Sequence, residues 1–292
     1  MFLKKEKLTV EALVLILLSI YSYSINWYSG NIGVIPIDSF GFLDTGYSII
    51  NGHLPIRDFW IFTGLLVDYM EAAFLYLFGN NWNSHLAHGS FMNIFATISL
   101  YYFLKEYDLK NSYICFYCLC FATLCYPLSG TPFAYLHAYI FSLIAIFNLL
   151  IAIKTKNRLL WLVFPFICLF AFLSMQTPTM YILIVLLFLL ILHFFKTKEF
   201  QNLRFFLIGG TLSISFLFLF LILTKTPLVN FIYQYILFPI TIGEGRITSK
   251  AIEYISLLKQ INQKRLFGEF KIIHIILIPL IFLSLKIIKK KK

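Results

Sequence analysis

Long stretches of this 292-residue chain contain no Asp, Glu, Lys or Arg, which is the feature that most limits how it can fold. A helix needs about 20 mostly apolar residues to cross the hydrocarbon core of a bilayer. The whole chain is 60% hydrophobic and 13% charged, whereas roughly a quarter of the residues of a soluble domain are charged. The sequence therefore predicts an all-α, polytopic membrane protein. The uncharged stretches are 113–153, 159–195, 205–224 and 272–285.

We predict about eight transmembrane helices in a single integral membrane domain that covers residues 1–292. The first helix follows three lysines, as the apolar region of a signal peptide would, but no small-residue cleavage site follows it. We therefore expect it to remain as an uncleaved helix. The predicted spans lie near 9–28, 89–104, 113–128, 136–153, 159–175, 179–195, 205–224 and 272–288.

Basic residues gather beside the predicted spans and indicate an orientation. The net charge of +11 would suggest a nucleic-acid partner for a soluble protein, but Lys and Arg beside membrane spans mark the cytoplasmic side. We therefore predict a cytoplasmic N-terminus and no nucleic-acid partner. Five clusters hold 16 of the 24 basic residues: Lys4/Lys5/Lys7, Lys105/Lys110, Lys154/Lys156/Arg158, Lys196/Lys198/Arg204 and Lys286 with Lys289–Lys292.

The five clusters share one side only if the segment 60–79 does not cross the membrane. This segment carries Asp68 and Glu71, which are three residues apart and so lie on one face of a helix. We predict an amphipathic re-entrant or juxtamembrane helix there, within a first extracytoplasmic loop at 29–88. The alternative is an ordinary span with two buried acids.

The same loop holds a cluster of carboxylates. Five of the 13 acidic residues of the chain lie between residues 38 and 79, and charges beside lipid are usually retained for binding or catalysis. Simpler roles are open for three of its charged residues: Asp38 would cap a helix that starts near Phe40, and Arg57 and Asp58 would form a solvated pair. The five acids are Asp38, Asp44, Asp58, Asp68 and Glu71.

Three other segments face the same side in this topology and complete a candidate site. They are the loop 126–137, the turn at 174–179 and the basic extracytoplasmic segment 225–271, in which 252–266 is predicted as a surface helix. Cations bind a lipid-linked phosphate through charge-assisted hydrogen bonds, and a carboxylate accepts the proton of a sugar hydroxyl. The candidate substrate-binding residues from these segments are His137, Gln176, Arg246 and Lys250.

The order of these residues resembles the GT-C superfamily of membrane glycosyltransferases, including protein O-mannosyltransferases and bacterial lipid A glycosyltransferases. The resemblance covers roughly residues 1–195. It implies that Asp38 is the catalytic base, and we predict that Asp44, Arg57 and Asp58 bind substrate nearby. The residues that carry it are Asp38, Gly52, Pro55, Arg57–Trp60, Leu77–Gly79 and the turn Gln176-x-Pro178.

The resemblance implies an inverting enzyme of the bacterial inner membrane that builds a cell-envelope glycan. Its donor would be a polyprenyl-phosphate sugar and its acceptor a glycan, a lipid or a protein. No cofactor or metal site is firmly implied, although a divalent metal stays open. The alternatives are a flippase or transporter for lipid-linked saccharide and a non-catalytic partner in glycan assembly. The latter would suit the second outer loop, which has no acid and offers only His137.

Overall fold

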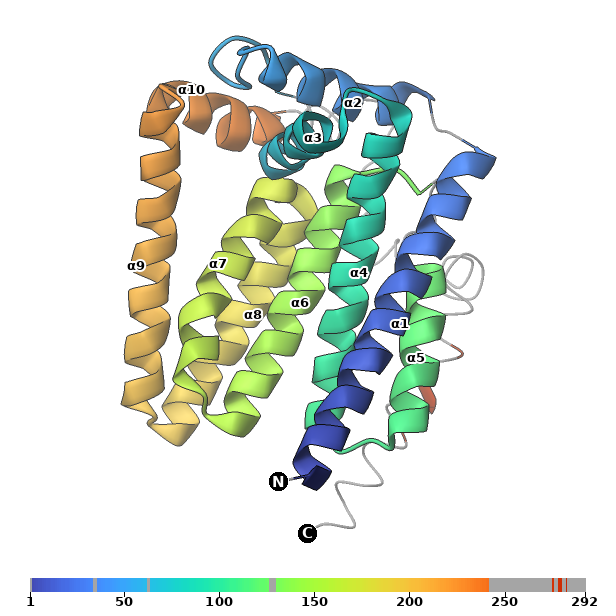
Figure 1. Ribbon diagram of the computed structural model, residues 1–292. Coiled ribbons are helices and arrows are strands. Elements are labelled where there is room, and N and C mark those ends of the chain that lie inside the picture. The colour runs from blue at the N-terminus through green and yellow to red at the C-terminus, as the bar shows by residue number, and fades with distance from the viewer. Residues whose placement is uncertain are drawn as a thin grey trace. The chain divides into compact units, whose positions relative to one another are not determined.

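The computed structural model of the protein (Figure 1) describes residues 2–33, 36–61, 64–125 and 130–241, together with Ile275, Ile278, Pro279 and Phe282. Its contacts form two units, 1–237 and 238–292, and the fold below is that of the first. The described residues contain no β-strand, which confirms the all-α class. The predicted surface helix at 252–266, together with Arg246, Lys250 and most of the span at 272–288, lies outside the described residues.

The unit 1–237 consists of α-helices joined mostly by short turns, with one π-helix at its end. The helices are α1 (Phe2–Ile32), α2 (Pro36–Ile50), α3 (Leu65–Phe78), α4 (Trp82–Glu106), α5 (Asn111–Leu124), α6 (Ala134–Thr155), α7 (Arg158–Ser174), α8 (Gln176–Thr197), α9 (Phe200–Leu223) and α10 (Leu228–Phe231), and the π-helix is Ile232–Leu237.

Local sequence explains several of the helix ends. The side chain of Asn81 accepts a hydrogen bond from the backbone N–H of Ser84 in α4, and that of Asn157 accepts one from the backbone N–H of Leu159 in α7. Lys156 and Lys198 end α6 and α8 in the left-handed conformation, each with φ 55°. Both turns between antiparallel helices are therefore short, and they bring basic residues to one end of the bundle.

Helices α1 and α4 to α9 run side by side with alternating direction (Figure 1), and α1 packs on α4, α4 on α6, α6 on α7 and α7 on α9. Ion pairs join their ends at the N-terminal end of the bundle. Lys105 contacts Glu11, and Lys156 lies 2.9 Å from Glu199. The helix ends next to four of the predicted basic clusters therefore gather at the end where α1 begins, as the sequence predicted.

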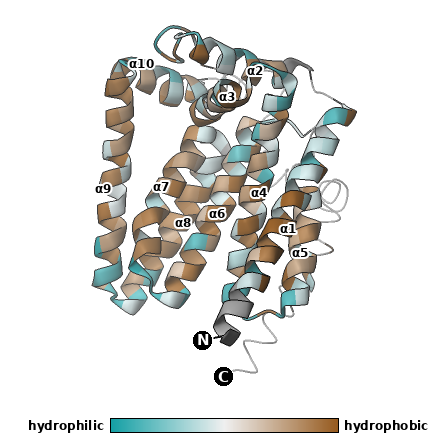
Figure 2. Ribbon diagram, in the orientation of Figure 1, coloured by the Kyte–Doolittle hydropathy of each residue, from teal (hydrophilic) through white to brown (hydrophobic). Residues whose placement is uncertain are grey.

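Four of the described helices are long and apolar enough, by length and composition, to cross a membrane. Their candidate spans are Thr9–Ile32, Ala134–Thr155, Thr179–Thr197 and Phe200–Leu223. Figure 2 shows these helices hydrophobic over most of their length, with hydrophilic residues at the turn between α8 and α9.

By this criterion the prediction of eight spans is wrong for the part of the chain that the structure describes. Helices α5 and α7, at 14 and 17 residues, are apolar but short. Helix α4 has 25 residues, yet it is not among the helices that are apolar enough, because its first half carries His, Asn and Ser side chains. Counting apolar runs in the sequence did not separate these helices from full spans.

Helices α2 and α3 lie across the ends of the long helices rather than beside them (Figure 1). Helix α3 has 14 residues and is therefore about 21 Å long, shorter than a hydrocarbon core of about 30 Å. This agrees with the prediction that 60–79 does not cross. The alternative interpretation, an ordinary span with two buried acids, was right about the burial, because Asp68 and Glu71 are both fully buried.

Candidate functional site

A fully buried carboxylate, Glu71 of α3, contacts two histidines of α4. Its Oε1 lies 2.9 Å from Nδ1 of His85, and its Oε2 lies 2.7 Å from Nδ1 of His88. The two histidines are three residues apart near the start of α4, so both rings reach the face that α3 covers. Burial raises the pKa of Glu71, but the hydrogen bonds with the two histidines outweigh this effect and hold its pKa below the ordinary value.

A third histidine extends this cluster into α6. Nε2 of His137 lies 3.1 Å from Nε2 of His88, and Nδ1 of His137 donates to the carbonyl oxygen of Phe133 at 2.8 Å. All three histidine side chains are fully buried. The ring of Phe74 stacks on His88, with 5.1 Å between ring centroids. We call Glu71, His85, His88 and His137 the Glu–His cluster.

Helix α2 covers the Glu–His cluster from the end of the bundle. A Cβ atom at Gly46 would lie 2.6 Å from Cγ of Glu71, so α2 approaches this closely only because residue 46 has no side chain. One residue earlier, the hydroxyl of Thr45 donates to Oδ1 of Asp68 at 2.9 Å. The two buried acids of α3 therefore dock α2.

The predicted catalytic carboxylate, Asp38, is exposed on the same helix. Helix α2 begins at Pro36, so Asp38 lies in its first turn and is not the cap of a helix that starts near Phe40. Asp44 is also exposed, and no hydrogen bond or ion pair joins either carboxylate to another described residue. Of the acids in the first loop, these two have side chains available to a ligand.

Arg57 and Asp58 pair with each other, as the simpler interpretation of the sequence allowed. Nε and Nη2 of Arg57 donate to the two carboxylate oxygens of Asp58 at 2.9 and 2.6 Å. Nη1 of Arg57 also donates to the carbonyl oxygen of Thr224 at the end of α9, at 3.2 Å. These bonds fasten the loop between α2 and α3 to α9, so both side chains already have partners.

Of the other predicted site residues, one belongs to the Glu–His cluster, one lies at the start of α8, and two lie outside the described residues. His137 belongs to the Glu–His cluster, and its full burial leaves no surface for a substrate. Gln176 is half-buried at the first position of α8, next to Met175, which packs against Phe42 and Val67 at the same end of the bundle. Arg246 and Lys250 remain predictions, since they lie outside the described residues.

Within the described part of the chain, no three His, Cys, Asp or Glu side chains are arranged to hold a metal ion. Both oxygens of Glu71 already have imidazole partners. Whether the protein uses a divalent metal stays a prediction that this arrangement does not test.

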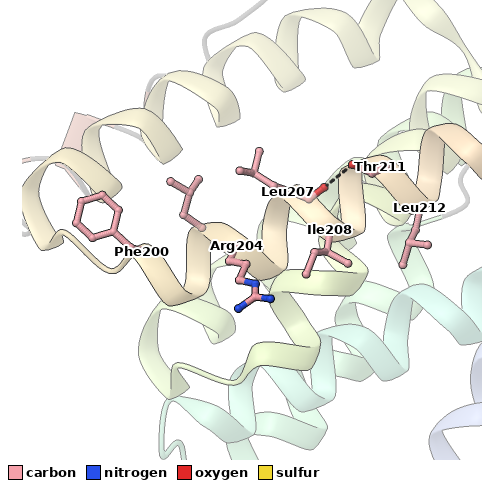
Figure 3. A pocket seen from close by; sticks show the side chains of 7 residues that line it. Phe200, Arg204, Leu207, Ile208, Thr211 and Leu212 are labelled. Carbon is pink, nitrogen blue, oxygen red and sulfur yellow. Dashed lines mark hydrogen bonds between the residues drawn. The ribbon is translucent and has the colours of Figure 1, made fainter.

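Below α3, an apolar groove of about 430 Å³ lies between α4 and α7. Its floor is α6, and its upper end is closed by Leu66 and Met70 of α3, while Phe95 of α4 and Phe166 of α7 line its sides. No polar atom lines it. A second hollow of similar volume follows α9 alone (Figure 3), where Arg204 is the one charged side chain among apolar residues and Thr211 bonds back to Leu207. It contains none of the site residues.

Sequence reasoning missed the Glu–His cluster. The acids Asp68 and Glu71 were identified, but His85 and His88 were not paired with them. The available signal was the matching spacing: two acids three residues apart on one short helix, followed by two histidines three residues apart at the start of the next helix. Two such helices joined by a three-residue turn would face each other with these side chains.

Comparison with known proteins gives no assignment: no protein-family model, no curated protein and no solved structure matches this chain.

Proposed function

We propose that the protein is an inverting glycosyltransferase that moves a sugar from a polyprenyl-phosphate donor to a glycan or lipid acceptor. The observation that carries the proposal is the position of Asp38. It is an exposed carboxylate without a hydrogen-bond or ion-pair partner among the described residues, on a helix that lies across the end of a bundle of apolar helices. A base for an acceptor at the membrane surface requires this combination.

The reaction assigns one step to this carboxylate. Asp38 accepts the proton of the acceptor hydroxyl while the hydroxyl oxygen attacks the anomeric carbon. The bond from that carbon to the phosphate oxygen breaks, and polyprenyl phosphate leaves with the bonding electrons. Asp44 is the second available acid of α2, and Arg246 and Lys250 are proposed to bind the departing phosphate.

The apolar groove between α4 and α7 is proposed to receive the polyprenyl chain. Its lining is wholly apolar, and it ends under α3, the helix that docks α2. A chain in this groove would lie against α6, one of the four candidate membrane spans, while its phosphate reached the end of the bundle where Asp38 lies. This arrangement supports the donor class and leaves the sugar open.

The cellular setting follows from the same proposal. We place the N-terminus in the cytoplasm of a bacterial cell and α2 and α3 on the outer face of the inner membrane, because the basic clusters gather at the opposite end. A flippase or a non-catalytic partner would share this topology. These alternatives differ from the enzyme in releasing no polyprenyl phosphate.

The test is transfer by the purified protein reconstituted in vesicles with polyprenyl-phosphate hexoses, measured as released polyprenyl phosphate. Asp38→Asn keeps the size of the side chain but removes the proton acceptor, so we expect turnover to fall about 10²- to 10⁴-fold. Asp108→Asn is the matched control, because Asp108 is also exposed and lies in the turn after α4, at the opposite end of the bundle. We expect this control to keep full turnover.

Two results would count against the proposal. Full turnover of Asp38→Asn would reject Asp38 as the base and make Asp44 the next candidate. Release of no polyprenyl phosphate by the wild-type protein, with any hexose donor, would reject the enzyme in favour of the flippase or the non-catalytic partner.

A further inference from the structure

The Glu–His cluster contains a linear series of three contacts that runs from α6 through α4 to α3. The carbonyl oxygen of Phe133 is followed by His137, then by His88, and then by Glu71, with separations of 2.8, 3.1 and 2.7 Å. All three distances fall in the range of hydrogen bonds. Each contact therefore needs one hydrogen atom.

Two neutral histidines and a carboxylate carry too few hydrogen atoms for these three contacts. Two neutral imidazoles carry one N–H each, and a carboxylate and a carbonyl carry none, so the three contacts would share two hydrogens. A carbonyl oxygen only accepts, which fixes one hydrogen on Nδ1 of His137. One of the other two contacts would then join two lone pairs. The series is satisfied only when it holds one additional proton.

The contacts of Glu71 favour its ionised form, which leaves the additional proton on an imidazole. His85 donates from Nδ1 to the other oxygen of Glu71, so both carboxylate oxygens accept hydrogen bonds and the ionised form is favoured. Burial outweighs the effect of the Glu71 carboxylate and holds the pKa of the His88 imidazole below its ordinary value, so the additional proton is inferred from the hydrogen count of the three contacts. Without the proton the cluster would be a buried net negative charge, whereas with it the cluster is a neutral ion pair.

Apart from the histidines of the cluster, Glu71 and His88 have no charged hydrogen-bond or ion-pair partner among the described residues. Helix α2 faces Glu71 with Gly46, which has no side chain. Asp68 lies one turn earlier on α3 and accepts from Thr45, so its own negative charge would favour the additional proton. His85 donates its Nδ1 hydrogen to Glu71, and its Nε2 atom has no hydrogen-bond partner among the described residues.

We propose that Glu71, His88 and His137 form a buried proton-binding site that holds one proton at neutral pH, as an imidazolium paired with the carboxylate. The bound proton joins α3 to α4 and α6. Because α2 rests on Glu71 through Gly46, loss of the proton also weakens the docking of α2. The site stands on its own contacts and is independent of the glycosyltransferase assignment.

A substitution follows directly from the hydrogen count. In Glu71→Gln, the amide oxygen accepts from His85 and the amide N–H donates to Nδ1 of His88. The N–H on Nε2 of His88 then donates to His137, whose Nδ1 still donates to Phe133. All contacts are satisfied with neutral histidines, so this variant needs no additional proton. The matched control is Asp68→Asn, a buried acid on the same helix that touches none of the histidines in the hydrogen bonds described.

The direct measurement is nitrogen NMR of the protein labelled with ¹⁵N in its six histidines, at pH 8. A free histidine with a pKa of about 6.5 is about 3% charged at this pH. We expect one histidine with both ring nitrogens protonated in the wild type and in Asp68→Asn, and none in Glu71→Gln. The absence of a charged histidine in the wild type at pH 8 would overturn the proposal, even if Glu71→Gln did not fold.

A second measurement uses stability. The folded wild type holds a proton that the unfolded chain releases above a histidine pKa of about 6.5. The stabilisation is therefore fully present below that pH and is lost as the pH rises through the folded-state pKa. Between pH 7.5 and the pH at which the site loses its proton, the unfolding constant of the wild type should rise about tenfold more per pH unit than that of Glu71→Gln. Equal pH dependence of the two proteins would contradict the bound proton.

Discussion

Replacing Gly46 by alanine tests whether α2 docks through its contact with Glu71. The added Cβ would lie 2.6 Å from Cγ of Glu71 and 3.1 Å from Cδ1 of Leu75. The first distance is roughly 1 Å shorter than the best carbon–carbon separation of about 3.5–4.0 Å. Glu71 cannot turn aside easily, because both its oxygens are bonded to histidines. We therefore expect α2 to move outward by roughly 1 Å.

The cost follows from the contacts that this movement changes. Overpacking of a buried contact costs about 1–3 kcal/mol. An outward movement also stretches the bond from Thr45 to Asp68 beyond hydrogen-bond length, which adds about 1 kcal/mol. Alanine regains about 1 kcal/mol of helix propensity relative to glycine. The net loss of unfolding free energy should be about 1–3 kcal/mol, measured by chemical or thermal denaturation in detergent.

The control for this substitution is Gly210→Ala, because apart from its chain neighbours and the nearby backbone of its own helix, nothing lies within 4 Å of a Cβ placed at Gly210. We expect it to stabilise the protein by about 0.5–1 kcal/mol, the usual gain for alanine in a helix. If α2 carries the catalytic base, the movement of about 1 Å in Gly46→Ala should also reduce transfer about 10²-fold. Stability and transfer equal to those of Gly210→Ala would refute the docking argument.

Two further predictions concern other parts of the bundle. Gly209→Ala should destabilise the protein by about 1–3 kcal/mol, opposite in sign to Gly210→Ala, because its Cβ would lie 2.1 Å from the backbone oxygen of Leu162 where α9 crosses α7. Similar melting temperatures for the two variants would contradict it. Hydrogen bonds with Arg57 lower the pKa of Asp58 to about 2. The stability from this pair is present above the unfolded pKa of about 3.9 and is lost as the pH falls through about 2. The wild type should therefore lose stability more steeply than Asp58→Asn between pH 4 and pH 2, and parallel curves would argue against the pair.

The sequence predicted the helical class and the position of α3 because both depend on coarse features. Apolar runs identify long helices, and the basic clusters placed 60–79 at the opposite end of the bundle. The predicted number of spans was wrong because the length of each helix, and the polar residues within each apolar run, determine whether a helix can cross the membrane. Apolar runs predicted a span in both α4 and α5. Helix α5 is too short for a full span at 14 residues, whereas α4 is long but carries His and Asn side chains.

The sequence could not predict how the loop between α2 and α3 folds. Ile56 is a β-branched residue with φ 70°, a conformation that usually costs about 1–3 kcal/mol. It is tolerated because the side chain is buried against residues of α7, α9 and α10, and because Gln234 of the π-helix bonds its carbonyl oxygen. These partners are more than a hundred residues away in the sequence, so no local pattern indicates them.

The acids of the first loop have two different physical roles, and the fold makes one depend on the other. Asp38 and Asp44 are exposed on the outer side of α2, where a carboxylate is hydrated and available to a substrate. Glu71 is buried under the same helix, where an ionised carboxylate is stable only with the histidines that surround it. Since α2 approaches through Gly46, the position of the exposed acids depends on the protonation of the buried cluster. A loss of transfer at alkaline pH is therefore expected from Glu71 and its histidines, and not from the catalytic carboxylate, which accepts a proton in its ionised form.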